Sequence, residues 1–257
     1  MSLNFVLISI FIGLFAGLCS GSFGIGGGIV ITPLARLFLN ISGLVAIGTS
    51  LPAAISTAIS GAFVYARKKF IIYKASILCA VAGSLMCLLG AKVTYYFTSP
   101  QIMLIFAAVL ALIALKFLFS KEGRVEKHGS IQFSFNTVII LFALGAFAGF
   151  LAGFLGIGGG IIVVPLLVII FKISIKQAIG TSLMFISLQA IPGSIQHYLL
   201  GHVDLALMLL IISCSIFGAQ LGARFTTKAK ERNVRVAFAI FLFLLAVTLA
   251  LFELFGL

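Results

Sequence analysis

Charge is scarce in this sequence, and acidic charge is scarcest. Only 9% of the 257 residues are charged and five are acidic, whereas 62% are hydrophobic. A soluble domain carries about 25% charged residues, so this chain could not cover a folded core with polar surface. Apolar runs of about 20 residues, the length that spans the hydrocarbon of a bilayer, recur along the chain. The composition therefore predicts a multi-pass membrane protein that has the lipid bilayer as its solvent.

Residues that would support covalent or metal chemistry are also lacking. The four cysteines fall inside apolar segments without metal-ligand spacing, and no nucleophile is paired with a base in a known motif. The sequence therefore predicts no enzyme, no metal site and no cofactor. The net charge of +12 does not indicate nucleic-acid binding, because the basic residues lie in short clusters between apolar segments.

What the chain does contain is an internal duplication. Residues 13–51 align with residues 145–183 without a gap, and 21 of these 39 positions are identical. The motif G-I-G-G-G-I occupies residues 24–29 and 156–161, and A-I-G-T-S-L occupies residues 46–51 and 178–183. We call the constant shift that relates these segments the repeat offset. The duplication predicts a first repeat at residues 1–119, a linker at 120–136 and a second repeat at 137–257.

Each half contains five apolar segments. They lie at about residues 5–20, 25–39, 44–65, 71–92 and 101–119, and at about residues 137–152, 157–171, 176–198, 203–224 and 234–252. Ten full spans are one arrangement that fits. We favour three transmembrane helices plus a Gly-rich re-entrant helical hairpin in each half, because the second segment is short and its glycines suit a helix interior poorly. The two glycine loops are then expected to meet.

Basic residues indicate how the halves are oriented. The loop between the third and fourth segments is basic in the first half only, and the loop between the fourth and fifth is strongly basic in the second half only. The basic clusters consist of Arg67, Lys68, Lys69 and Lys74; Lys121, Arg124 and Lys127; and Arg224, Lys228, Lys230, Arg232 and Arg235. The fold class predicted is thus an all-α membrane protein with inverted-topology repeats, its linker cytoplasmic and both termini outside.

The glycine motifs are the first candidate for a binding site. A Gly-rich turn that opens a helix exposes backbone N–H groups, and the helix dipole adds roughly half a positive charge there. Two such turns would bind an anion without a basic side chain. The candidate residues are Gly24, Gly26, Gly27, Gly28, Gly156, Gly158, Gly159 and Gly160. The alternative is close helix packing, which the GxxxG spacings at residues 13, 17 and 21 and at 145, 149 and 153 also indicate.

Polar side chains in the third segments are the second candidate. Hydroxyl and amide donors at membrane depth could complete the coordination of an oxyanion, or could simply form hydrogen bonds between helices. They are Thr49, Ser50, Ser56, Thr57, Thr181, Ser182 and Gln189. His197 near the end of a span could titrate or form a structural hydrogen bond. Arg36 could attract an anion at the outer mouth or extend to the membrane surface.

The duplicated G-x-x-G-I-G-G-G-I-x-x-x-P-L pattern, followed by A-I-G-T-S-L, resembles the TauE/SafE family over essentially the whole chain. The resemblance implies an inner-membrane carrier of sulfite, thiosulfate, sulfonates or related sulfur-containing anions. In the second repeat Val164 replaces the first repeat's Thr32, so the half-sites are unequal. A secondary transporter is the interpretation we favour. An anion channel and a non-transporting membrane scaffold are the alternatives, and the sequence leaves a homodimer open.

Overall fold

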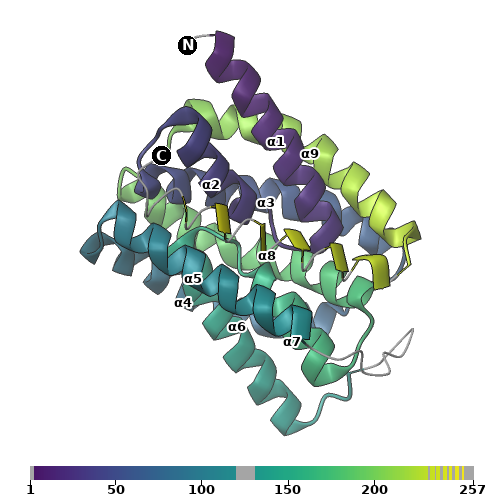
Figure 1. The fold of residues 1–257 in the computed structure, drawn as a ribbon. Helices are drawn as coiled ribbons and strands as arrows, with labels where there is room; N and C mark the ends of the chain where they lie inside the picture. The colour runs from purple at the N-terminus through teal and green to yellow at the C-terminus, as the bar shows by residue number, and fades with distance from the viewer. Residues whose placement is uncertain are drawn as a thin grey trace.

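The computed structural model describes residues 3–119 and 131–230, and some residues between 232 and 251. This part of the chain is helical with short connections and no strand (Figure 1). The helices are α1 (Leu3–Phe23), α2 (Gly28–Leu39), α3 (Gly43–Arg67), α4 (Tyr73–Val93), the short η1 (Thr94–Tyr96), α5 (Ser99–Phe119), α6 (Phe135–Leu155), α7 (Gly160–Phe171), α8 (Ile175–Leu199) and α9 (Leu205–Lys228). Residues 120–130 of the predicted linker, and many in the predicted segment 234–252, lie outside the described residues.

The helix boundaries follow the repeat offset found in the sequence. Helices α6, α7 and α8 begin and end at positions that match those of α1, α2 and α3, and α9 begins at the position that matches the start of α4. Ser42 and Ser174, which also match, cap α3 and α8 by accepting the backbone N–H groups of Val45 and Gln177. The duplication seen in the motifs therefore extends to the secondary structure.

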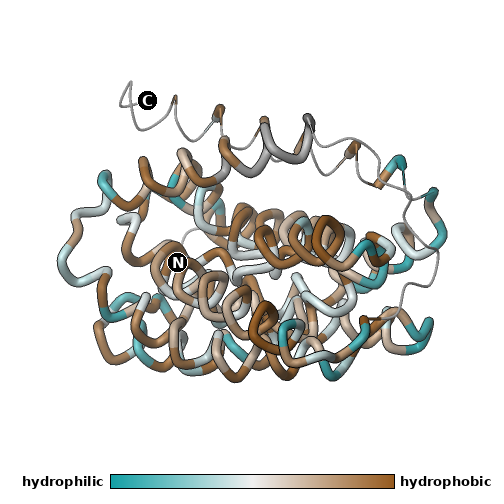
Figure 2. The backbone as a smooth tube through the Cα atoms, turned by 90° about the horizontal axis from the view of Figure 1, so that it is seen from below, coloured by the Kyte–Doolittle hydropathy of each residue, from teal (hydrophilic) through white to brown (hydrophobic). Residues whose placement is uncertain are grey.

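Among the residues that the structure describes, six helices are long and apolar enough to cross a membrane: α1, α3, α4 with η1, α6, α8 and α9. By contrast, α2 and α7 have 12 residues each, or ~18 Å, which is too short for a span. Hydrophobic residues dominate along the helices, and the hydrophilic ones lie mainly toward helix ends and connections (Figure 2). The predicted class, an all-α membrane protein, is confirmed, and the described residues contain six helices of spanning length.

The most extensive helix contacts join the two halves, whereas helices of the same half contact one another less. Along α1, Gly13 lies against Ile211 of α9 and Gly17 lies against Ser215, so α1 and α9 run parallel. Helices α3 and α8 run antiparallel, because Gly61 of α3 lies against Leu183 while Gly193 of α8 contacts the side chain of Leu51. The molecule is therefore built around contacts between helices of its two halves, of which α3 and α8 are a corresponding pair.

Small residues make the close α1–α9 and α4–α6 contacts. A Cβ added at Gly17 or Gly21 would overlap the backbone of α9, at the carbonyls of Ser215 and Ala219. In the equivalent pair, a Cβ at Gly149 would overlap the Gly83 carbonyl of α4. This confirms that the predicted GxxxG faces are helix-packing faces.

The basic connections gather at one end of the molecule. Lys176, in the first turn of α8, donates to the Thr227 carbonyl of α9 at 2.9 Å, and Gly180 lies against the Phe70 carbonyl of the α3–α4 connection. The Lys74 ammonium lies 4.4 Å from the ring centroid of Phe133, just before α6. The clusters around Arg67 and Arg224 therefore lie on the same side, as expected from the sequence.

Substitution of Gly17 or Gly149 by alanine is expected to destabilise the fold. Overpacking costs about 1–3 kcal/mol, and the ~1 kcal/mol gain in helix propensity from Gly to Ala offsets only part of that. Thermal unfolding of the purified protein would measure the loss. Ala143→Val, which adds more volume on an exposed face of α6, serves as the control and should leave the melting temperature within a few degrees. Unchanged stability of both glycine variants would contradict this account of the packing.

Candidate functional site

Two glycine-rich loops connect α1 to α2 and α6 to α7. We call residues 24–27 loop 1 and residues 156–159 loop 2. Three glycines in each loop have a positive φ between 68° and 80°. Side chains other than that of glycine are strained in this left-handed region by about 1–2 kcal/mol. The G-x-G-G spacing of both motifs is thus a requirement of the backbone conformation.

The loops meet where the two halves touch. Gly28, at the start of α2, lies against the Gly156 carbonyl, and Gly160, at the start of α7, lies against the Gly24 carbonyl. A Cβ at Gly28 or Gly160 would overlap the opposing carbonyl, so only glycine permits this approach. Both loops are buried throughout. The N-termini of the two short helices therefore lie side by side inside the protein, and the expectation that the loops meet is confirmed.

Serine side chains from the opposite half support each loop. The Ser182 hydroxyl of α8 donates to the Gly24 carbonyl of loop 1 at 2.8 Å. The Ser50 hydroxyl of α3 donates to the Gly156 carbonyl of loop 2 at 3.0 Å. These serines occupy the same position in the two A-I-G-T-S-L motifs. Each half thus fixes the start of the other half's loop.

Side chains of the same half satisfy a second pair of loop carbonyls. The Thr57 hydroxyl of α3 donates to the Gly26 carbonyl at 3.0 Å, and the Gln189 side-chain amide of α8 donates to the Gly158 carbonyl at 3.0 Å. Thr57 and Gln189 again occupy matching positions of the two repeats. Four of the loop carbonyls, two in each loop, therefore accept hydrogen bonds from buried side chains.

Unlike these carbonyls, several loop N–H groups have no hydrogen-bond partner in the described chain. Those of Gly26, Gly27, Gly158 and Gly159 donate to no acceptor within the described part of the chain. An unpaired N–H group buried away from water costs free energy comparable to a lost hydrogen bond. The helix dipoles of α2 and α7 add positive potential at the same place. The loops therefore present buried donors, with several of their acceptors already occupied.

The remaining predicted site residues form hydrogen bonds with partners outside the loops. Thr49 accepts the backbone N–H of Asp204 at 3.0 Å, and Thr181 accepts that of Ile72 at 3.0 Å. Each threonine thereby ties its helix to a connection of the other half. Ser56 donates to the Ala53 carbonyl at 2.8 Å and faces α9, where its Oγ lies 3.4 Å from that of a buried serine. Contact of Thr49, Ser56 or Thr181 with a substrate stays a prediction.

Two further residues complete the surroundings of the loops. Ile186 contacts the glycines of both loops, with its side chain 3.0 Å from a Cβ built on Gly26 and 3.4 Å from one built on Gly158. Thr32 donates to the Ser50 hydroxyl at 2.9 Å, which valine at position 164 cannot do for Ser182. The inequality of the half-sites was visible in the sequence, but the partner of Thr32 was not.

His197 forms a structural hydrogen bond. Its Nε2 lies 2.8 Å from the Gly153 carbonyl, as the Tyr65 hydroxyl lies 3.1 Å from the equivalent Gly21 carbonyl in the other half. Nε2 donates to that carbonyl, which can only accept, and Nδ1 lies 3.3 Å from Nδ1 of His202. Partial burial lowers the pKa of His202, in the α8–α9 connection, below its ordinary value.

Charged side chains are remote from the loops. Asp204 is the only acidic residue among those described, and it caps α9 by accepting the Leu207 N–H at 3.0 Å. Arg36 is in the last turn of α2 and donates to the Ile41 carbonyl at 3.1 Å. No metal-ligating cluster occurs in the part of the chain the structure describes.

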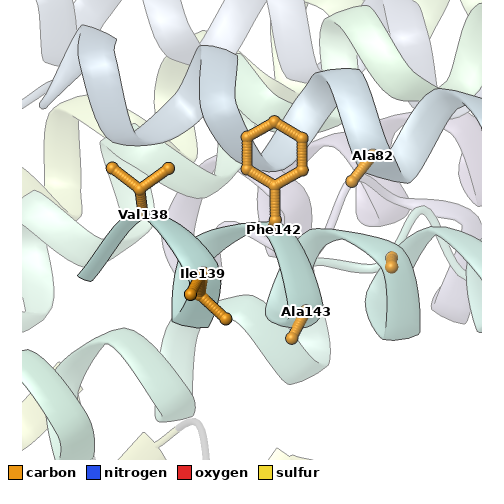
Figure 3. A pocket seen from close by; sticks show the side chains of 6 residues that line it. Ala82, Val138, Ile139, Phe142 and Ala143 are labelled. Carbon is orange, nitrogen blue, oxygen red and sulfur yellow. The ribbon is translucent and has the colours of Figure 1, made fainter. Parts of the chain in front are cut away.

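A hollow on the outer surface is not this site. It lies between α4 and α6, and Figure 3 shows that apolar side chains line it. Phe142 and Ile139, which both line it, are 37% and 51% exposed. A surface of this kind suits lipid chains and offers no donor to an anion.

Comparison with known proteins identifies the family of the chain. The family model described as Sulfite exporter TauE/SafE matches residues 9–249. The chain is 30% identical over 263 residues to the probable membrane transporter protein YunE of Bacillus subtilis, covering 95% of this chain and 96% of that protein. It is 27% identical over 241 residues to a probable membrane transporter protein of Methanocaldococcus jannaschii, covering 88% of each.

A third relative shows the same full-length correspondence. A probable membrane transporter protein of Haemophilus influenzae is 29% identical over 268 residues, covering 96% of this chain and 99% of that protein. All of these names describe transport proteins, which points away from an enzyme. With the duplicated glycine motif and six spanning-length helices, they show that the chain belongs to the TauE/SafE family of membrane transporters.

Proposed function

We propose that this protein is a secondary transporter of small sulfur-containing anions, of the sulfite, thiosulfate or sulfonate type, across the cytoplasmic membrane. The observation that carries the proposal is the imbalance of hydrogen-bonding groups at the two loops. Their carbonyls at Gly24, Gly26, Gly156 and Gly158 accept side-chain donors. Loop N–H groups next to those carbonyls have no acceptor in the described chain. A bound anion would supply the missing acceptors.

The same imbalance argues against a cation as substrate. Carbonyl oxygens at broken helices coordinate Na⁺ in some transporters, but four of the loop carbonyls here are already engaged. Acidic side chains, which mark many proton and cation pathways, are absent from the described membrane helices. Two adjoining helix N-termini favour negative charge. Electrostatics and hydrogen bonding therefore both support a negatively charged substrate.

The substrate class rests on chemistry and on family. A sulfite or sulfonate group has three oxygen atoms that can each accept N–H groups from several directions, which suits two loops that approach from opposite sides. The matching family model carries the description sulfite exporter. The carbon skeleton attached to the sulfur, and the direction of transport, are left for experiment.

Alternating access between inverted repeats is the mechanism we propose. The antiparallel crossing of α3 and α8 and the single-sided basic connections support repeats of opposite orientation at residues 1–119 and 137–257. Both loops are buried, so a substrate would reach them only if the halves move relative to one another. Because each half holds a loop of the other through Ser50 and Ser182, such movement would alter both loops together. One copy of the chain contains both loops.

Membrane orientation is tested by labelling single cysteines in intact cells. Lys68, at the basic end of α3, should be cytoplasmic, and Tyr96, which lies beyond the opposite end of α4, should face outward. An impermeant maleimide is expected to label Tyr96→Cys from outside and Lys68→Cys only after the membrane is opened. Strong external labelling at position 68 would contradict the proposed topology.

Anion binding is tested with the purified protein. Thermal unfolding in sulfite, thiosulfate, ethanesulfonate and, as a cation control, choline should reveal stabilisation by the sulfur anions only. A ligand at ~100 times its Kd stabilises by roughly 2.7 kcal/mol. Saturable counterflow in liposomes would then separate a carrier from an anion channel. Absence of binding or transport of every sulfur anion would refute the proposal and favour a non-transporting scaffold.

Gly27→Ala is expected to abolish this stabilisation while leaving a folded protein. A Cβ at Gly27 would lie 3.2 Å from the Thr57 hydroxyl, so Thr57 would have to shift by a few tenths of an ångström, and the φ of 75° is unfavourable for alanine. Gly201→Ala is the matched control, since Gly201 has a φ of 73° and no atom within 4 Å of an added Cβ. Both should lose about 1–2 kcal/mol of stability. Equal sulfite affinity in the two variants would show that loop 1 has a structural role and does not bind the anion.

A further inference from the structure

One buried polar atom beside loop 2 has no partner. Gln189 is fully buried on α8, and its side-chain nitrogen donates to the Gly158 carbonyl at 3.0 Å. Its oxygen, Oε1, is the only buried side-chain oxygen or nitrogen without a hydrogen bond in the part of the chain the structure describes. An acceptor that is buried without a partner loses its hydration and gains nothing in return, so this oxygen requires an explanation.

Rotation of the amide does not remove the problem. If the two terminal atoms of Gln189 exchanged places, Oε1 would face the Gly158 carbonyl, and two acceptors would repel each other. The Gly158 carbonyl would also lose its donor. The carbonyl of loop 2 therefore fixes which atom is the nitrogen, and the unpaired atom is an acceptor.

The first half contains no equivalent of this acceptor. Thr57, at the matching position, donates to the Gly26 carbonyl and accepts the Ser20 hydroxyl at 3.1 Å. Position 152, which matches Ser20, is alanine and has no hydroxyl to donate. The second half has thus both a longer amide side chain and no neighbouring donor. The unpaired acceptor therefore lies beside loop 2 and has no counterpart beside loop 1.

We propose that Gln189 Oε1 accepts a hydrogen bond from the bound substrate, so that the protein prefers sulfur anions that also carry an O–H or N–H group. This inference rests on the proposed function, because it places the substrate at the glycine loops. The loop N–H groups bind the anionic oxygens, and Oε1 binds the donor on the same molecule. A donor-free anion of equal charge would leave Oε1 unpaired.

The test compares three ligands that share a two-carbon sulfonate skeleton. Ethanesulfonate has no donor, and 2-hydroxyethanesulfonate has an O–H at the same net charge. The third ligand, 2-aminoethanesulfonate, has N–H donors on an ammonium group and is therefore a zwitterion at neutral pH. Titration calorimetry on the purified full-length protein at one pH measures each Kd. We expect the hydroxyl or the amino ligand to bind roughly tenfold more tightly than ethanesulfonate, which corresponds to one buried hydrogen bond.

Gln189→Thr tests whether this preference belongs to Oε1. In the first half a threonine at the matching position reaches its loop carbonyl, so the threonine introduced on α8 is expected to support loop 2 while removing the free acceptor. In this variant the Kd of ethanesulfonate should exceed that of the hydroxyl ligand by no more than about twofold, whatever the absolute affinities of the variant are. Ala152→Ser is the second variant if the threonine variant does not fold. It introduces at the matching position the hydroxyl that Ser20 supplies in the first half, which should occupy Oε1 and lower the preference while the Gln189 amide keeps its bond to the Gly158 carbonyl.

Each outcome bears on a different statement. Equal affinities of the three ligands for the wild-type protein would overturn the inference and leave anion binding intact. A preference that persists in the Gln189 variant would also overturn it, because another group would then accept the donor. Failure of all three sulfonates and of sulfite to bind would refute the proposed function itself.

Discussion

Backbone polar groups inside a membrane protein must be paired within the chain or by a ligand, and the two glycine loops depend on this constraint. Four loop carbonyls are paired with buried side chains of α3 and α8, two within a half and two across the halves. Those bonds hold a left-handed backbone that brings the starts of α2 and α7 into contact. The same conformation leaves neighbouring N–H groups without acceptors in the described chain. The backbone conformation that the side chains stabilise is thus the same one that offers N–H groups to an anion.

The duplication made much of the fold predictable. A fixed offset predicted corresponding helices in both halves, and the glycine spacing identified both the loops and the packing faces of α1 and α6. Local sequence is sufficient for these features because glycine at a particular backbone position has few substitutes. The short α2 and α7 were expected for the same reason, since three consecutive glycines interrupt an apolar segment that is already too short to span.

The partners of the polar side chains were much less predictable. Thr49 and Thr57 are eight residues apart, or ~12 Å along a helix, and they have different partners: the Asp204 N–H for Thr49 and the Gly26 carbonyl for Thr57. Both were candidates because they are polar residues of the same apolar segment, yet depth along the helix separates them. Ser50 and Ser182 bond across the halves, which depends on the antiparallel crossing of α3 and α8. A helical pattern within one half contains no information about that crossing. The unpaired oxygen of Gln189 likewise follows from Ala152, on a different helix.

The central claim is that backbone N–H groups of the two loops hold the anion. Anomalous diffraction from crystals soaked in selenite, the heavier analogue of sulfite, tests it most directly, because selenium locates the anion without reference to activity. The account predicts one strong selenium peak between loops 1 and 2, with its oxygens within hydrogen-bonding distance of the N–H groups of Gly26, Gly27, Gly158 or Gly159. Selenium only at the basic end of the molecule, near Arg67 or Arg224, would contradict it.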